Sequence, residues 1–99
     1  MSTFATERPA AVRAIRFTGQ EMTVHLEDGR KVSMPLEWYP RLLAGTPQQR
    51  ERAQLIGEGE GIHWPELDEH ISLESILAGR RSAESESSFR RWLERRTAG

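Results

Sequence analysis

Apolar and polar residues alternate along the first third of the chain. Apolar residues alternate with polar ones at Ile15 and Phe17 within residues 11–18, throughout residues 22–26, and at Val32 and Met34 within residues 30–34. A period of two is typical of a strand with one buried face. Asp28 and Gly29 separate the second and third segments, and Asp-Gly is a preferred pair for a tight hairpin turn. We therefore expect three antiparallel strands, whose buried side chains are those of Ile15, Phe17, Met22, Val24, Leu26, Val32 and Met34.

Proline and capping residues predict two short helices after these strands. The first spans residues 36–43 and contains Pro40, which breaks or kinks a helix because it lacks an N–H. The second begins at the Thr-Pro-Gln-Gln sequence of residues 46–49, which supplies an N-cap, a proline at the first helical position and the glutamine of a capping box. We expect this second helix to end near residue 54 and, because it is polar, to lie at the surface.

Large aromatic side chains are few, and we assign three of them to the core. Trp and Tyr concentrate binding energy at interfaces, which makes Trp38 and Tyr39 candidates for contact with a partner. Because the chain has few other large apolar residues, we expect both to be half-buried instead, and Trp64 to lie in the core.

Glycine and glutamate alternate at residues 57–61. We expect a fourth strand over residues 55–64, in which the glycines leave one face bare. Another element can then approach the backbone closely, or the strand bulges. A glycine-rich loop can also cradle phosphate, but here the glutamates repel phosphate and no Lys-Ser or Lys-Thr pair follows. We therefore favour the structural role.

A capped helix is predicted near the end of the domain. Ser72 is a suitable N-cap and Gly79 a suitable C-cap, with Ile76 and Leu77 facing inward. The expected fold class is α+β, with a small antiparallel sheet of about four strands, short helices packed on one side and a C-terminal helix. The chain divides into an N-terminal arm, a single α+β domain, and a Ser-rich tether with a basic amphipathic helix, at residues 1–10, 11–79 and 80–99.

Several motifs resemble the bacterial domain-of-unknown-function family 2442. The most specific is His-Trp-Pro-x-Leu-Asp-Glu, and the resemblance runs from about Val12 to Gly79. It implies a small α+β domain without an established catalytic activity, encoded beside a second small protein in an arrangement like toxin and antitoxin. His70 stands where the family usually has a third acidic residue. The motifs are Asp28-Gly29, Pro40-Arg41-Leu42, Gly61-Ile62-His63-Trp64-Pro65, Leu67-Asp68-Glu69, Ile71-Ser72 and the ending from Leu77 to Gly79.

Charge is unevenly distributed along the 99 residues, although the net charge is only −1. Residues 57–78 hold six acidic side chains and no Lys or Arg, whereas residues 79–99 hold six arginines and three glutamates. The chain has no cysteine, which excludes disulfides, thiolate catalysis and Cys-based metal sites, and we expect no cofactor. It shows no signal peptide and no apolar stretch of membrane-spanning length, so we expect a cytoplasmic protein.

One cluster, His63, Asp68, Glu69 and His70, has residue types suited to catalysis or metal binding. A metal site needs three such ligands about 2 Å from one ion. Adjacent carboxylates on an extended segment point to opposite faces, which weakens an acid/base pair of Asp68 and Glu69. We favour a structural role, in which one of these carboxylates accepts backbone N–H bonds and fixes the chain's corner. We therefore expect no catalytic and no metal-binding residue.

The C-terminal tail is a second functional candidate. Phe89, Trp92, Leu93 and Arg96 fall on one face of a helix, with other arginines around it. Three hypotheses remain open: the helix docks on its own domain, inserts into a protein partner or a second copy, or contacts nucleic acid. Serines in residues 82–88 are typical of a flexible tether, which favours insertion into a partner's groove.

These features predict a non-enzymatic protein-interaction module, antitoxin-like or an inhibitor within a two-protein system. An acidic corner, residues 66–69, and the C-terminal helix are the expected contact surfaces. The alternative is a nucleic-acid-binding regulator that uses the tail, and a metal-dependent hydrolase built on His63, Asp68 and His70 comes third. We expect no membrane partner. The expected partner-binding residues are Glu66, Asp68, Glu69, Phe89, Arg90, Arg91, Trp92 and Arg95.

Overall fold

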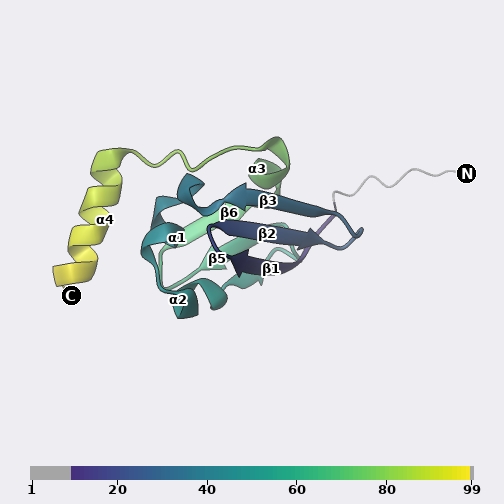
Figure 1. Cartoon of the computed structure of the whole chain (residues 1–99), viewed down its shortest axis with the longest axis horizontal. Helices are drawn as coiled ribbons and strands as arrows, with labels where there is room; N and C mark the ends of the chain where they lie inside the picture. The colour runs from purple at the N-terminus through teal and green to yellow at the C-terminus, as the bar shows by residue number, and fades with distance from the viewer. Residues whose placement is uncertain (1–9, 99) are drawn as a thin grey trace, which may run out of the picture.

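Six strands form two antiparallel sheets of three strands each in a computed structural model that describes residues 10–98 (Figure 1). The first sheet has the order β1-β2-β3 and the second the order β4-β5-β6. Their bounds are β1 Val12–Thr18, β2 Glu21–Leu26, β3 Lys31–Pro35, β4 Gln54–Ile56, β5 Gly61–Trp64 and β6 Glu69–Ser72. The helices are the 3₁₀ turn η2 Leu36–Trp38, α1 Pro40–Ala44, α2 Pro47–Glu51, α3 Leu73–Ala78 and α4 Glu86–Ala98.

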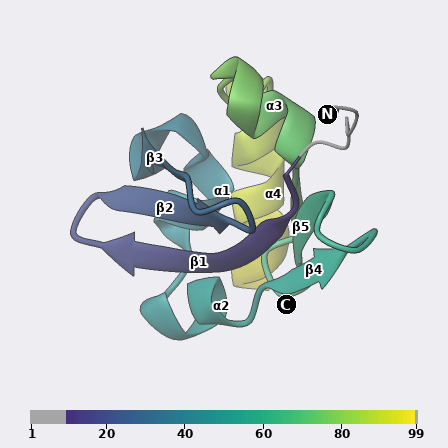
Figure 2. The ribbon, with the colours of Figure 1, turned by 90° about the vertical axis from the view of Figure 1, so that its right-hand side faces the viewer.

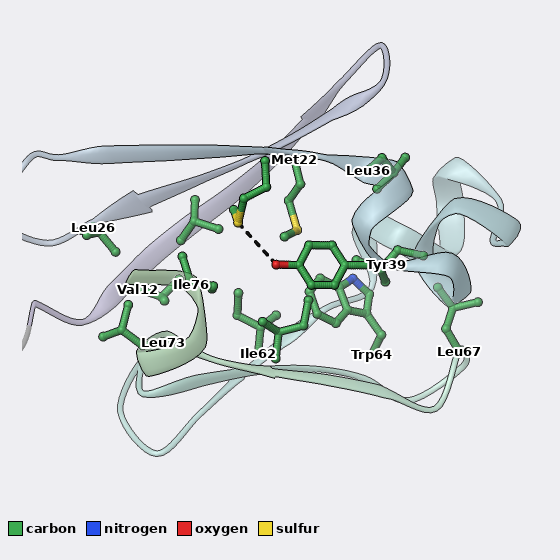
Figure 3. Packing of buried hydrophobic residues seen from close by; sticks show 14 of the residues in the cluster. Val12, Met22, Leu26, Leu36, Tyr39, Ile62, Trp64, Leu67, Leu73 and Ile76 are labelled. Atoms are coloured by element: carbon green, nitrogen blue, oxygen red, sulfur yellow. Dashed lines mark hydrogen bonds between the residues drawn. The ribbon is translucent and has the colours of Figure 1, made fainter. Parts of the chain in front are cut away.

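The hydrophobic core lies between the two sheets (Figures 2 and 3). Met22, Val24 and Leu26 of β2 face Ile62 and Trp64 of β5, and all five are completely buried. Each strand thus contributes one apolar face to a shared interior, which is how small sheets become stable. The expected α+β class, the antiparallel pairing and the C-terminal helix are confirmed.

The first sheet contains the three predicted strands, and the side chains predicted to be buried are so in β2 and at Met34, whereas Ile15, Phe17 and Val32 are only half-buried. β1 pairs with β2 and β2 with β3, with Val24 opposite both Ile15 and Val32. The hairpin between β2 and β3 turns at Asp28 and Gly29, where the Asp28 carboxylate accepts the Arg30 N–H and Gly29 takes a φ of +96°. The sequence prediction of three strands joined by this turn is confirmed.

The second sheet differs from the single strand expected over residues 55–64. Residues 57–60 form a tight turn between β4 and β5, because Gly57, Glu58 and Gly59 all adopt positive φ. Alternating Gly and Glu imitates the period of a strand, yet glycine also supplies turn geometry, and here the turn prevails. β6 was not predicted, so the count rises from about four strands to six.

Close backbone approach explains the glycines better than a bare strand face. A Cβ at Gly59 would lie 2.7 Å from the Ala11 Cβ and 2.9 Å from the Val12 carbonyl oxygen. The Gly59 carbonyl accepts the Val12 N–H at 2.9 Å, which ties the turn of the second sheet to β1 of the first. The expected close approach is therefore confirmed at this residue.

The helices begin where their caps predict. Thr46 and Gln49 form the full capping box of α2, and Ser72 caps α3, which ends at Gly79 in a left-handed conformation. Three details differ from the expectations. Pro40 starts α1 as a separate helix after η2, α2 ends at Glu51 because β4 follows at once, and Leu77 is 42% exposed because Leu73 and Ile76 take the inward face of α3.

Trp38 and Trp64 lie as expected, whereas Tyr39, expected to be half-buried, is fully buried in the core. Tyr39 and Trp64 are buried, and Trp38 is half-buried, with the Arg81 guanidinium 5.1 Å from the centre of its ring. The Trp64 indole donates a hydrogen bond to the Arg50 carbonyl, and the Tyr39 hydroxyl lies 3.5 Å from the Met34 sulfur (Figure 3). Within residues 10–98, no helix is both long enough and apolar enough to cross a membrane.

Candidate functional site

The acidic corner is the loop that joins β5 to β6. Its Leu67 side chain is fully buried, and the Leu67 N–H donates to the Trp64 carbonyl, so the loop is anchored at its middle. Asp68 then takes a φ of +53°, a conformation that Asp tolerates better than most residues. Its side chain is 73% exposed as a result.

Arginines from three other elements bind this corner. Arg41 of α1 donates to the Asp68 carbonyl at 2.8 Å and to its carboxylate at 3.2 Å. Arg52, just after α2, pairs with Glu66 at 2.7 Å, and Arg96 of α4 reaches the Glu66 carbonyl at 3.4 Å. The corner is therefore a fixed structure, in which Glu66 and Asp68 each pair with an arginine.

Glu69 occupies a different environment from its acidic neighbours. Its side chain is half-buried, and its carboxylate accepts the His70 N–H at 2.8 Å. Burial raises the pKa of the Glu69 carboxyl above its ordinary value, against the opposing effects of this hydrogen bond and of the Arg41 charge. The predicted structural role, a corner carboxylate that accepts a backbone N–H, is confirmed for this residue.

The predicted cluster of catalytic residue types is not brought to one point. His63 and His70 face each other across β5 and β6 with ring centres 6.5 Å apart, while Asp68 is engaged by Arg41. Across residues 10–98, no three His, Asp or Glu side chains approach closely enough to hold one metal ion. His63 and His70 are thus cross-strand neighbours in the second sheet.

Helix α4 packs on its own domain through the predicted apolar face. Trp92 is only 3% exposed, and its ring lies between two guanidinium groups, Arg41 at 5.2 Å and Arg96 at 4.6 Å from the ring centre. Phe89 stacks on it with ring centres 5.6 Å apart. Of the three hypotheses for the tail, the structure adopts self-docking, so Phe89 and Trp92 contact their own chain.

The Ser-rich segment before α4 is bound to the domain rather than hanging free as a tether. The Ser82 N–H donates to the Trp38 carbonyl, and Arg41 Nε donates to both oxygens of Glu84, at 2.9 and 3.0 Å. Glu84 is 10% exposed, and the hydrogen bond from Arg41 is the largest of the effects that lower the pKa of its carboxyl. Ser87 and Ser88, expected in the tether, already belong to α4.

Arg41 is the residue that sequence reasoning missed. It joins α1 to the acidic corner through Asp68, to the linking segment through Glu84 and to α4 through Trp92. Its place in the Pro-Arg-Leu motif was the available signal, but a lone arginine in a short helix does not reveal which distant carboxylates it will meet.

The acidic corner and α4 are joined through Arg41 and Arg96, and α4 stands at one end of the molecule (Figure 1). In Figure 2, viewed from the opposite end, α4 lies behind both sheets. Its described outer face carries exposed Arg90, Arg91 and Arg95, and the charge of Arg95 contributes to the lowered pKa of Glu84. We call this combination of the corner with the outer face of α4 the composite surface.

Comparison with protein families shows where the chain belongs. Residues 12–82 match the family described as "Protein of unknown function (DUF2442)", so the chain is a member of that family. The resemblance noted in the sequence is confirmed, and α4 lies outside the matched region. Comparison with curated proteins finds no match.

Two solved structures share the fold. A protein of unknown function from Rhodospirillum rubrum is 23% identical with a TM-score of 0.67, over 83% of this chain and 99% of the other. An uncharacterized protein from Chromobacterium violaceum is 21% identical with a TM-score of 0.63, over 74% of this chain and 69% of the other. At these identities the likeness concerns the fold alone.

Proposed function

We propose that this member of the unknown-function family is a non-enzymatic, cytosolic protein-binding module, the antitoxin-like or inhibitory member of a two-protein system. It binds its protein partner through the composite surface. The observation that carries the proposal is the junction of the two predicted contact regions. Arg41 and Arg96 each contact both the acidic corner and Trp92 of α4, so two segments that are distant in the sequence present a single face.

The exposed charges of this face suit recognition of a protein. Asp68 presents a carboxylate that is mostly in solvent, and Arg90, Arg91 and Arg95 present guanidinium groups from α4. Opposite charges side by side give a partner a defined orientation and accelerate encounter, more than they add affinity. Because the backbone of the corner is fixed by Arg41 and by buried Leu67, the binding face is preorganised and little entropy is lost on association.

The test is retention of a partner by the tagged full chain from cells that encode it, at low salt, with retained proteins identified by mass spectrometry. Asp68→Lys and Arg95→Glu each reverse one charge of the composite surface, and we expect each to reduce retention of a stoichiometric protein about tenfold. Glu27→Lys, which reverses an exposed charge beside the β2–β3 hairpin, is the matched control and should retain the partner fully.

Equal retention by all three variants contradicts the composite surface as the binding site. Failure of the unmodified chain to retain any protein in stoichiometric amount contradicts the proposed function itself. Circular dichroism of each variant shows whether the fold is intact, so that loss of binding is not confused with unfolding.

A second candidate function rests on the three exposed arginines of α4. Clustered guanidinium groups attract phosphate backbones in a manner that weakens steeply with salt. If the protein is instead a nucleic-acid-binding regulator, nuclease treatment removes what the chain retains, and the triple variant Arg90→Gln, Arg91→Gln, Arg95→Gln retains none at 50 mM salt. Retention that survives nuclease excludes this candidate.

A further inference from the structure

A groove of about 590 Å³ follows strand β6. One wall includes every residue from 68 to 72, and the other includes every residue from 80 to 84 in the extended segment before α4. Successive side chains of a strand point to opposite faces, so a groove on one face would touch alternate residues only. The uninterrupted lining shows that this groove runs along the backbone edge of β6.

The edge of β6 is free to accept another strand. In the described part of the chain the sheet order is β4-β5-β6, which leaves β6 with a partner on one side. The His70 N–H donates to the Glu69 carboxylate instead of to β5, so it points into the groove. Residues two apart point the same way, so the Ser72 N–H faces the same side.

Charges along the groove are separated by sign. At the end where β6 begins, three carboxylates, those of Asp68, Glu69 and Glu84, surround the single guanidinium of Arg41. At the other end lie Arg80 and Arg81, both exposed, and the Arg80 N–H is bonded to the Ser75 carbonyl of α3. An occupant that runs along β6 therefore meets an acidic end and a basic end.

We propose that this groove binds an extended segment of the protein partner as a fourth strand of the second sheet, antiparallel to β6. An acidic residue near the N-terminal end of that segment faces Arg80 and Arg81, and a Lys or Arg near its C-terminal end faces Glu69. Main-chain hydrogen bonds to the edge give affinity and the end charges give direction, as in other strand additions. The inference rests on the proposed function, because it takes the partner to be a protein.

Dimensions and chemistry agree with this occupant. β6 is four residues long, about 13 Å at 3.3 Å per residue, and the groove volume lies within the ~300–1,000 Å³ usual for binding sites. An incoming main-chain carbonyl can take the His70 N–H, which frees the Glu69 carboxylate for the cation. Burial raises the pKa of the Glu69 carboxyl, and an adjacent cation on the bound segment acts in the opposite direction.

Two peptides of identical composition provide the test. Each has seven residues with blocked ends and alternating Val and Thr in the middle; one begins with Glu and ends with Lys, and the other has the reverse order. Titration of the ¹⁵N-labelled full chain by NMR should show the Glu-first peptide binding about tenfold tighter than the reversed one, with shift changes at the His70 and Ser72 amides and at residues 80–84. N-methylation of the Glu-first peptide at alternate residues should abolish binding.

Variants distinguish the effect of the Glu69 charge on peptide binding from an effect on folding. Glu69→Gln keeps the size of the side chain. We expect it to weaken binding of the Glu-first peptide about tenfold and to remove the preference for one peptide order over the other. Glu74→Gln, at an exposed residue of α3 that does not line the groove, is the control and should change nothing. Equal binding of the two peptides, shift changes confined to other strands, or undiminished binding of the N-methylated peptide overturns the inference.

Experiments can distinguish failure of the strand-addition inference from failure of the proposed function. A chain that retains a partner through Asp68 and Arg95 but binds neither peptide overturns the strand-addition inference alone. A chain that binds the Glu-first peptide at β6 but retains no protein overturns the partner proposal, and the peptide site stands as a groove for some other cationic segment.

Discussion

The two-sheet core and helix α4 are held in place by different physics. Between the sheets, aliphatic and aromatic side chains from strands and short helices are buried against one another. Among the described side chains of α4, Trp92 alone is fully buried, and it packs between guanidinium groups of Arg41 and Arg96. Apolar burial depends weakly on salt and pH, whereas ion pairs between guanidinium groups and carboxylates depend on both.

This difference means that α4 is separable from the domain that carries it. We expect the core between the sheets to persist when α4 leaves, although Trp92 belongs to the buried cluster, because the family match, residues 12–82, ends before α4 begins. A region attached in this way opens at lower free energy than the core. The composite surface therefore consists of a stable corner and a helix whose docking depends on salt and pH. Four changes test whether the core and α4 differ in this way.

Truncation of the central core residue should have the largest effect. Trp64→Ala removes a completely buried indole and its hydrogen bond to the Arg50 carbonyl, so we expect a loss of about 3–5 kcal/mol in the free energy of unfolding. Urea denaturation followed by circular dichroism measures it. Trp38→Ala, at a half-buried tryptophan, is the control and should cost less than half as much; equal losses would show that the core is not centred between the sheets.

The turn that ties the second sheet to β1 comes next. Gly59→Ala places a Cβ against Ala11 and the Val12 carbonyl at a φ of +91°, so strain and crowding together should cost about 3 kcal/mol. Gly29→Ala has a similar φ of +96° with open space around it, and should cost about 1 kcal/mol. The difference between the two variants, measured by thermal unfolding, isolates the close approach; no difference would mean that the turn relaxes freely.

Undocking of α4 should be smaller and local. Trp92→Ala removes its buried anchor, and the loss in unfolding free energy is limited to about 1–2 kcal/mol because α4 can leave while the core remains. Hydrogen exchange by mass spectrometry should show faster exchange at residues 86–98 and unchanged protection in β2 and β5. Arg91→Ala, at an exposed α4 residue, should leave exchange unaltered. Faster exchange throughout the sheets after Trp92→Ala would show that α4 belongs to the core.

The smallest expected effect is a pH dependence of docking. Arg41 lowers the pKa of the Glu84 carboxyl below its ordinary value of 4.5, so this ion pair contributes fully above about pH 5, and the contribution is lost as the pH falls through the lowered pKa. Glu69 acts in the opposite direction, because its raised pKa favours the folded state as the pH falls.

Exchange rates of α4 amides between pH 6 and pH 3, corrected for intrinsic rates, test this dependence. Glu84→Gln should give α4 at neutral pH the faster exchange that the unmodified chain reaches only in acid, an effect of about 1 kcal/mol or less. Glu66→Gln disrupts an exposed ion pair with Arg52 and should leave the pH profile unchanged. A profile that Glu84→Gln does not alter would assign the dependence to another group.

Much of the fold could be predicted from local patterns, and the misses have local causes too. The alternation of apolar and polar residues predicted β1 to β3, and the capping residues predicted α2 and α3. Both patterns depend only on residues that are close together in the sequence. The β4–β5 hairpin was missed because alternating glycines are compatible both with a strand that has one bare face and with a tight turn. β6 was missed because it is only four residues long and is defined by its pairing with β5.

The candidate site was less predictable than the fold. The acidic corner and the apolar face of α4 were both visible in the sequence, but their meeting was not. It depends on Arg41 and Arg96 reaching carbonyls and carboxylates that lie 27 and 30 residues away along the chain.

The sequence by itself determined the α+β class, the first sheet, the helix caps and which residues of α4 are apolar, because each follows from the conformational preferences of adjacent residues. The tertiary structure alone decided that α4 docks on its own domain, that arginines bind the acidic corner and that β6 has a free edge beside a groove. Those outcomes depend on distances between residues far apart in the chain, and such distances are fixed only when the two sheets pack together.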